Sequence, residues 1–434
     1  MKLWQKGNAT DKLFERFTIG EDQELDLLIA HYDVIGTRAH IKMLHAIGLL
    51  SESELASLLT ELDTIKNSIA SRTFVIEDEI EGCQSQIEWL LTRALGDVGK
   101  KIHTARSRND QVLTALKLFT KAELKEIAVL LRSLFELLQM KSEKTKEILM
   151  PGYTHMQVAM PSSFGMWFGA HAESLVDDLI QLKSALQITD KNPLGSAAGF
   201  GSSFPIDRDL TTREMGFADL NYNAVYAQMT RGKMERQVSY SIANLAATLS
   251  KYCMDVCLFS GQNFDFFKLD TAFTTGSSIM PHKHNPDGFE LVRAKCNQLQ
   301  SLPYEMSLLT NNLPSGYHRD FQILKEHFLP SFFKLKDCLK MTISMTENLE
   351  AKESLLEDER YELLFTVEEV NRLVQQGIPF RDAYQKVGKT VLADEFVANK
   401  QLHHTHIGSI GNLANDRIKE AFLKEWKELG IDDK

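Results

Sequence analysis

The positions of helix breakers and apolar residues predict a chain of long helices. Only 10 prolines and 24 glycines interrupt the 434 residues, and they cluster, which leaves long tracts that contain neither. The tract at residues 112–150 would form a helix about 55 Å long. Residues 233–260 and 331–376 are similarly uninterrupted, and we expect a boundary in the latter near 350–359, where charged residues are dense. Apolar residues recur at helical spacing in the first tract, at Leu116, Phe119, Leu124, Ile127, Leu131, Leu134, Phe135 and Leu138.

Helices of this length need neighbours along their whole length to bury their apolar stripes, so we predict an all-α fold built around a long-helix bundle. We expect three helical domains: an N-terminal domain at residues 1–105, a central long-helix bundle at 106–355 and a small C-terminal domain at 356–434. The glycine-rich segment 193–201 has no strand before it and no lysine in P-loop register. We therefore interpret it as a substrate-side loop between helices.

The composition is that of a globular protein with a large core. Hydrophobic residues make up 43% of the chain. The first seven residues lack the apolar segment of a signal peptide, and no stretch approaches the roughly 20 apolar residues of a membrane span. We therefore expect a cytoplasmic protein with no membrane partner. The five cysteines are too few and too scattered for a disulfide framework, so we expect reduced, buried thiols.

The charge distribution indicates a small anionic substrate. A formal net charge of −10 argues against a nucleic-acid partner, which usually requires a basic face. Cationic residues nevertheless occur inside the motifs described below, at Arg106, Arg108, Lys283, Arg319 and Lys325. An acidic protein that concentrates cations in this way is expected to bind a polycarboxylate there.

The run GSSIMPHKHNPD at residues 276–287 is the most informative segment of the chain. Its two prolines and Gly276 exclude a regular helix or strand, so it is a shaped loop. Residues 289–296 have a helical pattern, which places the loop just before a helix N-terminus, where anions are stabilised. Hydroxyl, lysine and amide side chains in such a loop predict chemistry on a negatively charged substrate.

This run resembles the GSSxMPxKxNP signature of the fumarase/aspartase superfamily, whose members cleave a C–N or C–O bond and release fumarate. Three more segments resemble the argininosuccinate lyases of that superfamily: HTARSRNDQ at 103–111, PGYTHMQVAMP at 151–161 and YHRDFQILK at 317–325. The resemblance covers nearly the whole chain. It implies β-elimination of argininosuccinate to L-arginine and fumarate in arginine biosynthesis, with no metal or other cofactor. It also implies a homotetramer with a 20-helix core, in which each active site is assembled from three subunits.

The resemblance assigns a role to each motif residue. A β-elimination needs a base, stabilisation of a carbanion and an acid for the leaving group. By family correspondence Ser277 is the base, its hydroxyl held close to an alkoxide by a nearby cation and loop amides. Lys283 stabilises the carbanion, Asn285 binds the substrate beside it, and His155 is the candidate general acid. Thr154 is expected to bind a substrate carboxylate, and Ser107, Arg108 and Asn109 are expected to bind the carboxylates of the succinyl moiety. The residues expected to hold the amino-acid end of the arginine moiety are Tyr317, Gln322 and Lys325.

The chain also departs from the family pattern at several positions. Gln84 stands where members usually carry a histidine ahead of a glutamate, here Glu88, and Ala105 stands where they carry glycine. His284 replaces a second lysine. The segment at residues 17–22 lacks the family's substrate-binding serine. These differences concern the pocket for the arginine end more than the elimination.

Three alternatives remain open at this point. The first is an adenylosuccinate lyase or another fumarate-releasing member of the superfamily; an adenylosuccinate lyase shares the Pro-His-Lys form of the loop but would need a nucleotide phosphate site. A metal enzyme could use His103, His155, His282 and His284, although no cysteine or carboxylate pattern completes a ligand set. A catalytically silent protein, as the lens δ-crystallins of this superfamily are, would not need the full set of loop residues that this chain retains.

Overall fold

A computed structural model describes residues 11–431, and it confirms the all-α prediction. The chain divides into two compact units. The first unit comprises the residues up to Ile127 together with Gln181–Ala243 and Gln298–Leu335, and the second comprises Ala128–Ile180, Asn244–Asn297 and the residues from Lys336 onward. The division into three domains stays a prediction.

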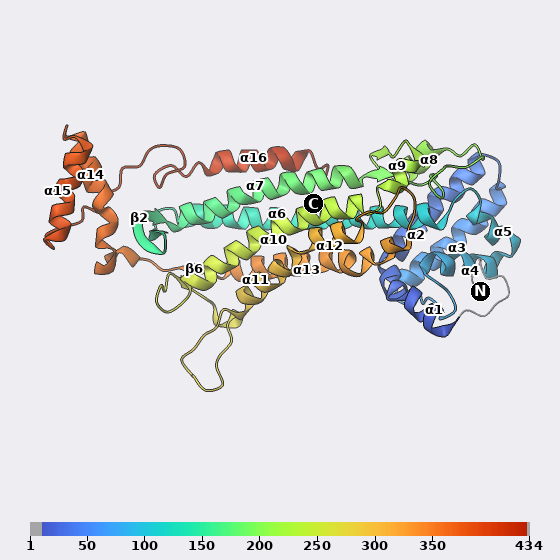
Figure 1. The fold of residues 1–434 in the computed structure, drawn as a ribbon, viewed down its shortest axis with the longest axis horizontal. Coiled ribbons are helices and arrows are strands. Elements are labelled where there is room, and N and C mark those ends of the chain that lie inside the picture. Colours follow the sequence, from blue (N-terminus) through green and yellow to red (C-terminus); the bar gives the residue numbers. More distant parts are fainter. Residues whose placement is uncertain (1–10, 432–434) are drawn as a thin grey trace. The chain divides into compact units, whose positions relative to one another are not determined.

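Figure 1 shows the helices and strands in chain order, and these elements divide between the two units as follows. The first unit holds α1 (Lys12–Ile19), α2 (Asp22–Ala46), α3 (Glu52–Ala70), α4 (Cys83–Leu95), α5 (Asp97–Lys100), η1 (Lys101–His103), β3 (Lys191–Asn192), α8 (Arg208–Met215), β4 (Asp219–Leu220), α9 (Ala224–Met229), α12 (Leu302–Leu309) and η3 (Arg319–Gln322). Five helices carry residues of both units: α6 (Arg108–Lys144), α7 (Phe164–Thr189), α10 (Lys233–Phe259), α11 (Asp287–Leu299) and α13 (Leu324–Glu347).

The remaining elements belong to the second unit. They are β1 (Leu149–Thr154), β2 (Gln157–Ser163), β5 (Phe267–Lys268), η2 (Thr271–Phe273), β6 (Glu350–Ala351), η4 (Leu355–Glu357), η5 (Glu359–Phe365), α14 (Thr366–Gln375), α15 (Phe380–Leu392) and α16 (Asn415–Lys427). Among residues 11–431, none of the helices combines the length and the apolarity that a membrane crossing requires.

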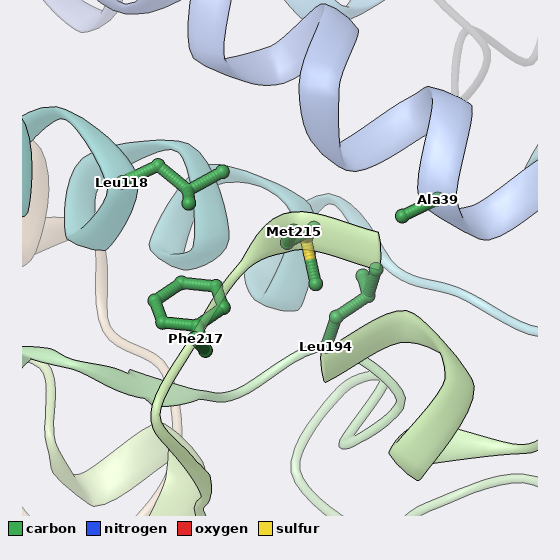
Figure 2. Close-up of a cluster of buried hydrophobic side chains, with 5 residues drawn as sticks. All are labelled: Ala39, Leu118, Leu194, Met215 and Phe217. Carbon is green, nitrogen blue, oxygen red and sulfur yellow. The ribbon is translucent and has the colours of Figure 1, made fainter. Parts of the chain in front are cut away.

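In the first unit, α2 packs against α3, α4 and α8. A buried apolar cluster joins α2, α6 and α8 to the loop that follows β3: it contains Ala39, Leu118, Leu194, Met215 and Phe217 (Figure 2). Each of these side chains is less than a tenth exposed. Because the cluster includes a loop residue, Leu194, it fixes the start of the glycine-rich segment as well as the helices.

In the second unit, side chains join the helices of the bundle. Trp167 of α7 stacks on Tyr252 of α10 with ring centroids 5.5 Å apart, and the Tyr252 hydroxyl lies 2.8 Å from Thr346 Oγ1 of α13. α7 begins beside the end of α6, where a Cβ on Gly165 would lie only 2.6 Å from the carbonyl oxygen of Ser142. Glycine is therefore required at this crossing.

The helical tracts match the predicted ones unevenly. α10 spans almost the whole tract 233–260, and α13 ends at Glu347, just before the boundary expected near 350–359. α6 begins at Arg108 and ends at Lys144, six residues short of the tract that ends at 150. The reason is tertiary, because the last residues of that tract enter β1, which pairs with β2. The sequence pattern did not predict this hairpin.

The backbone at Ala105 gives a stability prediction. Ala105, in the turn between η1 and α6, has φ of 64°, a left-handed conformation that costs alanine roughly 1–2 kcal/mol and costs glycine little. Ala105→Gly should therefore raise the free energy of unfolding by about 0.5–1 kcal/mol, measured by denaturant titration. The control Ala122→Gly, inside α6, should lower it by about 1 kcal/mol. Equal losses in both variants would contradict strain at residue 105.

Candidate active site

A cavity of about 250 Å³ opens in the first unit where four chain segments meet. The first turn of α6, the start of α2, the segment before α4 and the region around η3 form its walls. Five of the substrate-binding residues expected from the sequence line it: Arg108, Asn109, Tyr317, Gln322 and Lys325. The fold thus brings the motif at 103–111 together with the motif at 317–325.

The N-terminus of α6 is capped beside this cavity. The Asn109 amide donates to Ser107 Oγ at 3.3 Å, and the Ser107 amide donates to Asp110 Oδ1 at 2.9 Å. This arrangement caps the helix, with Asp110 in the third helical position as in a capping box but with the serine oxygen bound to the second helical amide. A helix N-terminus carries partial positive charge, so the first turn that supplies Arg108 and Asn109 suits a carboxylate ligand.

The other oxygen of Asp110 holds the glycine-rich loop. Asp110 is fully buried, and its Oδ2 accepts hydrogen bonds from the amides of Gly195 at 2.9 Å and Ala197 at 2.8 Å. The segment 193–201 is a loop between β3 and α8, as expected. Its role on the substrate side stays a prediction.

A carboxylate and a hydroxyl orient Arg108. Its guanidinium donates to Ser85 Oγ at 2.7 Å and lies 4.0 Å from Glu88 Oε2, which is itself 3.4 Å from His103 Nδ1. Burial is the largest influence on the Glu88 carboxyl and raises its pKa, but the neighbouring His103 and Arg108 outweigh it and the pKa lies below its ordinary value. Glu88 therefore stays ionised and fixes the direction of Arg108.

Lys325 is bound by two aspartates that the sequence reasoning missed. Its ammonium lies 2.7 Å from Asp22 Oδ1 and 2.7 Å from Asp26 Oδ1. Burial lowers the pKa of Lys325, but the two carboxylates outweigh burial and raise the pKa above its ordinary value. The only signal in the sequence was the spacing of Asp22 and Asp26, four residues apart at a helix start, which places both on one face.

In the second unit, His155 sits at the turn of the β1–β2 hairpin. Thr154 pairs with Gln157, so His155 and Met156 form a two-residue turn, with φ of 53° and 60°. Both values are positive, as in a type I′ turn, which normally takes Asn-Gly. Tyr153 anchors the strand end, its ring 5.6 Å from that of Phe264. Thr154 and His155 are exposed. Strained residues of this kind are typical of functional sites.

The loop at 276–287 has the predicted position and a defined closure. Backbone hydrogen bonds between Thr275 and Asn285, at 3.2 and 2.9 Å, close its base, and α11 begins at its last residue. Ser277 Oγ accepts hydrogen bonds from the amides of Ile279 at 3.3 Å and Met280 at 3.1 Å. The loop therefore aims backbone donors at the serine oxygen.

The two motifs of the second unit remain separate from each other. The Lys283 side chain is exposed, and the side-chain Nδ2 of Asn285 donates to the carbonyl oxygen of Gly276 at 3.5 Å within the same loop. Among residues 11–431, no hydrogen bond or ion pair joins this loop to the hairpin that carries Thr154 and His155. The structure thus forms each motif without bringing the proposed acid and base into contact.

Histidines do not converge on a metal site in the described chain. His404 Nε2 lies 2.9 Å from Glu368 Oε1, and His103 lies beside Glu88. Within residues 11–431, no group of three or more His, Cys, Asp or Glu side chains is arranged to hold a metal ion. The metal-enzyme alternative therefore has no ligand set in this part of the chain.

Comparison with known proteins agrees with this picture. Residues 5–301 match the model of a family described as Lyase. A protein of Bacteroides fragilis (strain YCH46) named argininosuccinate lyase is 59% identical over 417 residues, which cover 96% of this chain and 93% of that protein. A protein of Thermotoga neapolitana with the same name is 40% identical over 388 residues, 89% of this chain and 98% of that protein.

A solved structure shows the same fold at low identity. An EDDS lyase variant with bound fumarate superposes with a TM-score of 0.77 at 20% identity, covering 97% of this chain and 91% of that chain.

The Asp110 carboxylate can be tested directly. Asp110→Asn keeps the size of the side chain but turns one acceptor oxygen into a donor, which must then face a backbone N–H group. The free energy of unfolding should fall by about 2–3 kcal/mol, and the amides of Gly195 and Ala197 should exchange hydrogen faster. The control Asp209→Asn, on the exposed side of α8, should change stability by less than about 0.5 kcal/mol. Similar losses in both variants would contradict the role of Asp110.

Proposed function

This chain belongs to the argininosuccinate lyase family and is a lyase, and from that premise we propose that it cleaves argininosuccinate to L-arginine and fumarate with the residues described above. The observation that carries the assignment of roles is the loop at 276–287, whose backbone amides converge on Ser277 Oγ. Neither the adenylosuccinate lyase nor the silent-protein alternative has an observation in its favour.

The first step is removal of a proton by Ser277. As an alkoxide, Ser277 Oγ takes the proton from the succinyl methylene carbon, and the electron pair moves towards the adjacent carboxylate. The amides of Ile279 and Met280 stabilise negative charge on the serine oxygen before the step. Lys283 stabilises the charge that then develops on the substrate, and Asn285 binds the same carboxylate.

The second step breaks the C–N bond. The electron pair on the substrate forms the double bond of fumarate, and the guanidino nitrogen leaves with its bonding pair and takes a proton from His155. The proton taken from carbon stays on Ser277, and His155 has lost its proton. After arginine and fumarate leave, Ser277 gives its proton to water and His155 takes one from water, which restores both side chains. Thr154, next to His155, binds a substrate carboxylate. His155 is exposed on a hairpin turn, and this position supports a role in which it contacts a substrate bound outside the hairpin.

The cavity of the first unit binds the rest of the substrate. Ser107, Arg108 and Asn109 take the carboxylates of the succinyl moiety, supported by the helix N-terminus and by the fixed direction of Arg108. Tyr317, Gln322 and Lys325 line the part that takes the amino-acid end of the arginine moiety.

We place these motifs in a homotetramer with a 20-helix core and in active sites assembled from three copies, in three domains as expected from the sequence. Exposed apolar side chains on the second unit's helices support an interface with other copies, because such an interface would remove their apolar surface from water. They are Val129, Met140, Met166, Met254, Leu291 and Met341. A cytoplasmic location fits the free cysteines of the chain.

The proposal is tested by an assay with argininosuccinate as substrate, in which the ultraviolet absorbance of fumarate reports its release. Ser277→Ala should lower kcat by about 10²- to 10⁴-fold, because the base is lost without a cavity being made. Lys283→Met should be comparably damaging in kcat. The matched control is Ser278→Ala in the same loop, which should stay within about tenfold of the unaltered protein. Activity of Ser277→Ala within tenfold would overturn the role of the serine.

Assembly of the site from several copies gives a separate prediction. Ser277→Ala and His155→Asn proteins, each inactive alone, should regain part of the activity when they are denatured and reannealed together, because some hybrid sites receive both intact residues. Mass measurement confirms that hybrids form. Recovery near zero in confirmed hybrids would mean that the two residues act from one chain.

A further inference from the structure

Two residues of the first unit's cavity depart from the family pattern and have no part in the mechanism above. Asp22 lies at the end of the segment where the family carries a substrate-binding serine, and Gln84 stands where it usually carries a histidine. Both line the cavity, together with Gln322 and Lys325. Their contacts show what each can offer a ligand.

Asp22 is the second carboxylate on the Lys325 ammonium. Asp26, which is only 3% exposed, already pairs with Lys325 through Oδ1 and accepts the Cys83 amide through Oδ2 at 3.1 Å. Asp22 pairs with the same ammonium at 2.7 Å, and 19% of its side chain is exposed. The three side chains thus carry one net negative charge at the cavity wall. Burial raises the pKa of Asp22, so a cationic ligand would compensate for lost hydration.

Gln322 presents an acceptor at the same wall. Its Nε2 donates to the carbonyl oxygens of Thr18 at 2.9 Å and Ile19 at 3.1 Å, which uses both of its N–H groups. The group of Gln322 that remains for a ligand is its Oε1. Two acceptors, one of them ionised, suit a primary ammonium group, which has three N–H donors.

Gln84 presents a donor without an acceptor. The side chain is buried, 3% exposed, and within residues 11–431 its Nε2 has no hydrogen-bond partner. A Cβ on Gly82 would lie 3.4 Å from Gln84 Oε1 and 2.3 Å from Asp26 Oδ2, so Gln84 belongs to the same end of the cavity as the aspartates. Buried N–H groups are nearly always paired in folded proteins, and a ligand carboxylate would supply the missing acceptor.

We propose that Asp22 and Gln84 recognise the zwitterionic α-amino-acid end of the substrate, Asp22 binding the α-ammonium and Gln84 the α-carboxylate. The inference rests on the proposed function and extends it by defining the substrate class. The α-amino group must be free and charged, so an Nα-acylated substrate, which has no positive charge there, binds poorly.

Three guanidino ligands separate the two contacts, with binding measured by calorimetry on the full-length protein. L-arginine has both charged groups, agmatine only the ammonium, and Nα-acetyl-L-arginine only the carboxylate. Asp22→Asn should lower the affinity for L-arginine and for agmatine by about 10- to 100-fold, and it should change the affinity for Nα-acetyl-L-arginine by no more than about twofold. Gln84→Met should lower the affinity for L-arginine and for Nα-acetyl-L-arginine by about tenfold, and it should change the affinity for agmatine by no more than about twofold.

Asp97→Asn is the matched control, because Asp97 pairs with Lys100 at 2.7 Å but lies outside the cavity lining. It should bind all three ligands as the unaltered protein does. Equal weakening of all three ligands by Asp22→Asn would overturn the proposal and make the pair with Lys325 purely structural. Should Asp22→Asn not fold, the unaltered protein still decides: equal affinity for L-arginine and Nα-acetyl-L-arginine overturns the proposal.

The fumarate assay keeps this test apart from that of the proposed function. If argininosuccinate yields fumarate but the ligands are not discriminated, only the assignment of Asp22 and Gln84 fails. If no fumarate forms, the proposed function fails whatever the binding results are.

Discussion

The buried carboxylate of Asp110 holds together the segments on which the first unit's cavity depends. It accepts hydrogen bonds from the amides of Ser107, Gly195 and Ala197, and each of these donors would otherwise need another partner. One oxygen completes the cap of α6 and so fixes the turn that carries Arg108. The other fixes the glycine-rich loop. Removing such a buried charge costs more than a single hydrogen bond, because all its donors lose their acceptor together.

Charge in this cavity is arranged in pairs rather than as a basic patch. Arg108 faces Glu88, and Lys325 faces Asp22 and Asp26. The sequence showed the cations within the motifs, and it suggested that positive charge alone would attract a polycarboxylate. The accompanying carboxylates change that expectation, because they fix the cations in place and reduce the net charge. Recognition must then follow from the match between ligand groups and fixed partners more than from long-range attraction.

The sequence predicted the features whose determinants lie close together along the chain. α10 follows from a tract without breakers, and the loop at 276–287 follows from its prolines and glycine. The hairpin turn at His155 was not predictable, because its positive φ angles normally call for Asn-Gly and are held here by the paired strands. The pairing of Asp26 with Lys325 joins residues 299 positions apart, and no local pattern reports such a contact.

The exposure of the loop at 276–287 bears on how Ser277 could act as a base. Two backbone amides reach its oxygen, but hydrogen bonds that compete with water contribute little to ionising a hydroxyl. The same donors and the charge of Lys283 act much more strongly where water is excluded, because the effective dielectric constant falls. In the proposed assembly, other copies of the chain cover this loop, and this covering has a second effect besides bringing the catalytic residues together. It would supply the low-dielectric surroundings in which a serine alkoxide becomes accessible, which makes basicity and assembly parts of one mechanism.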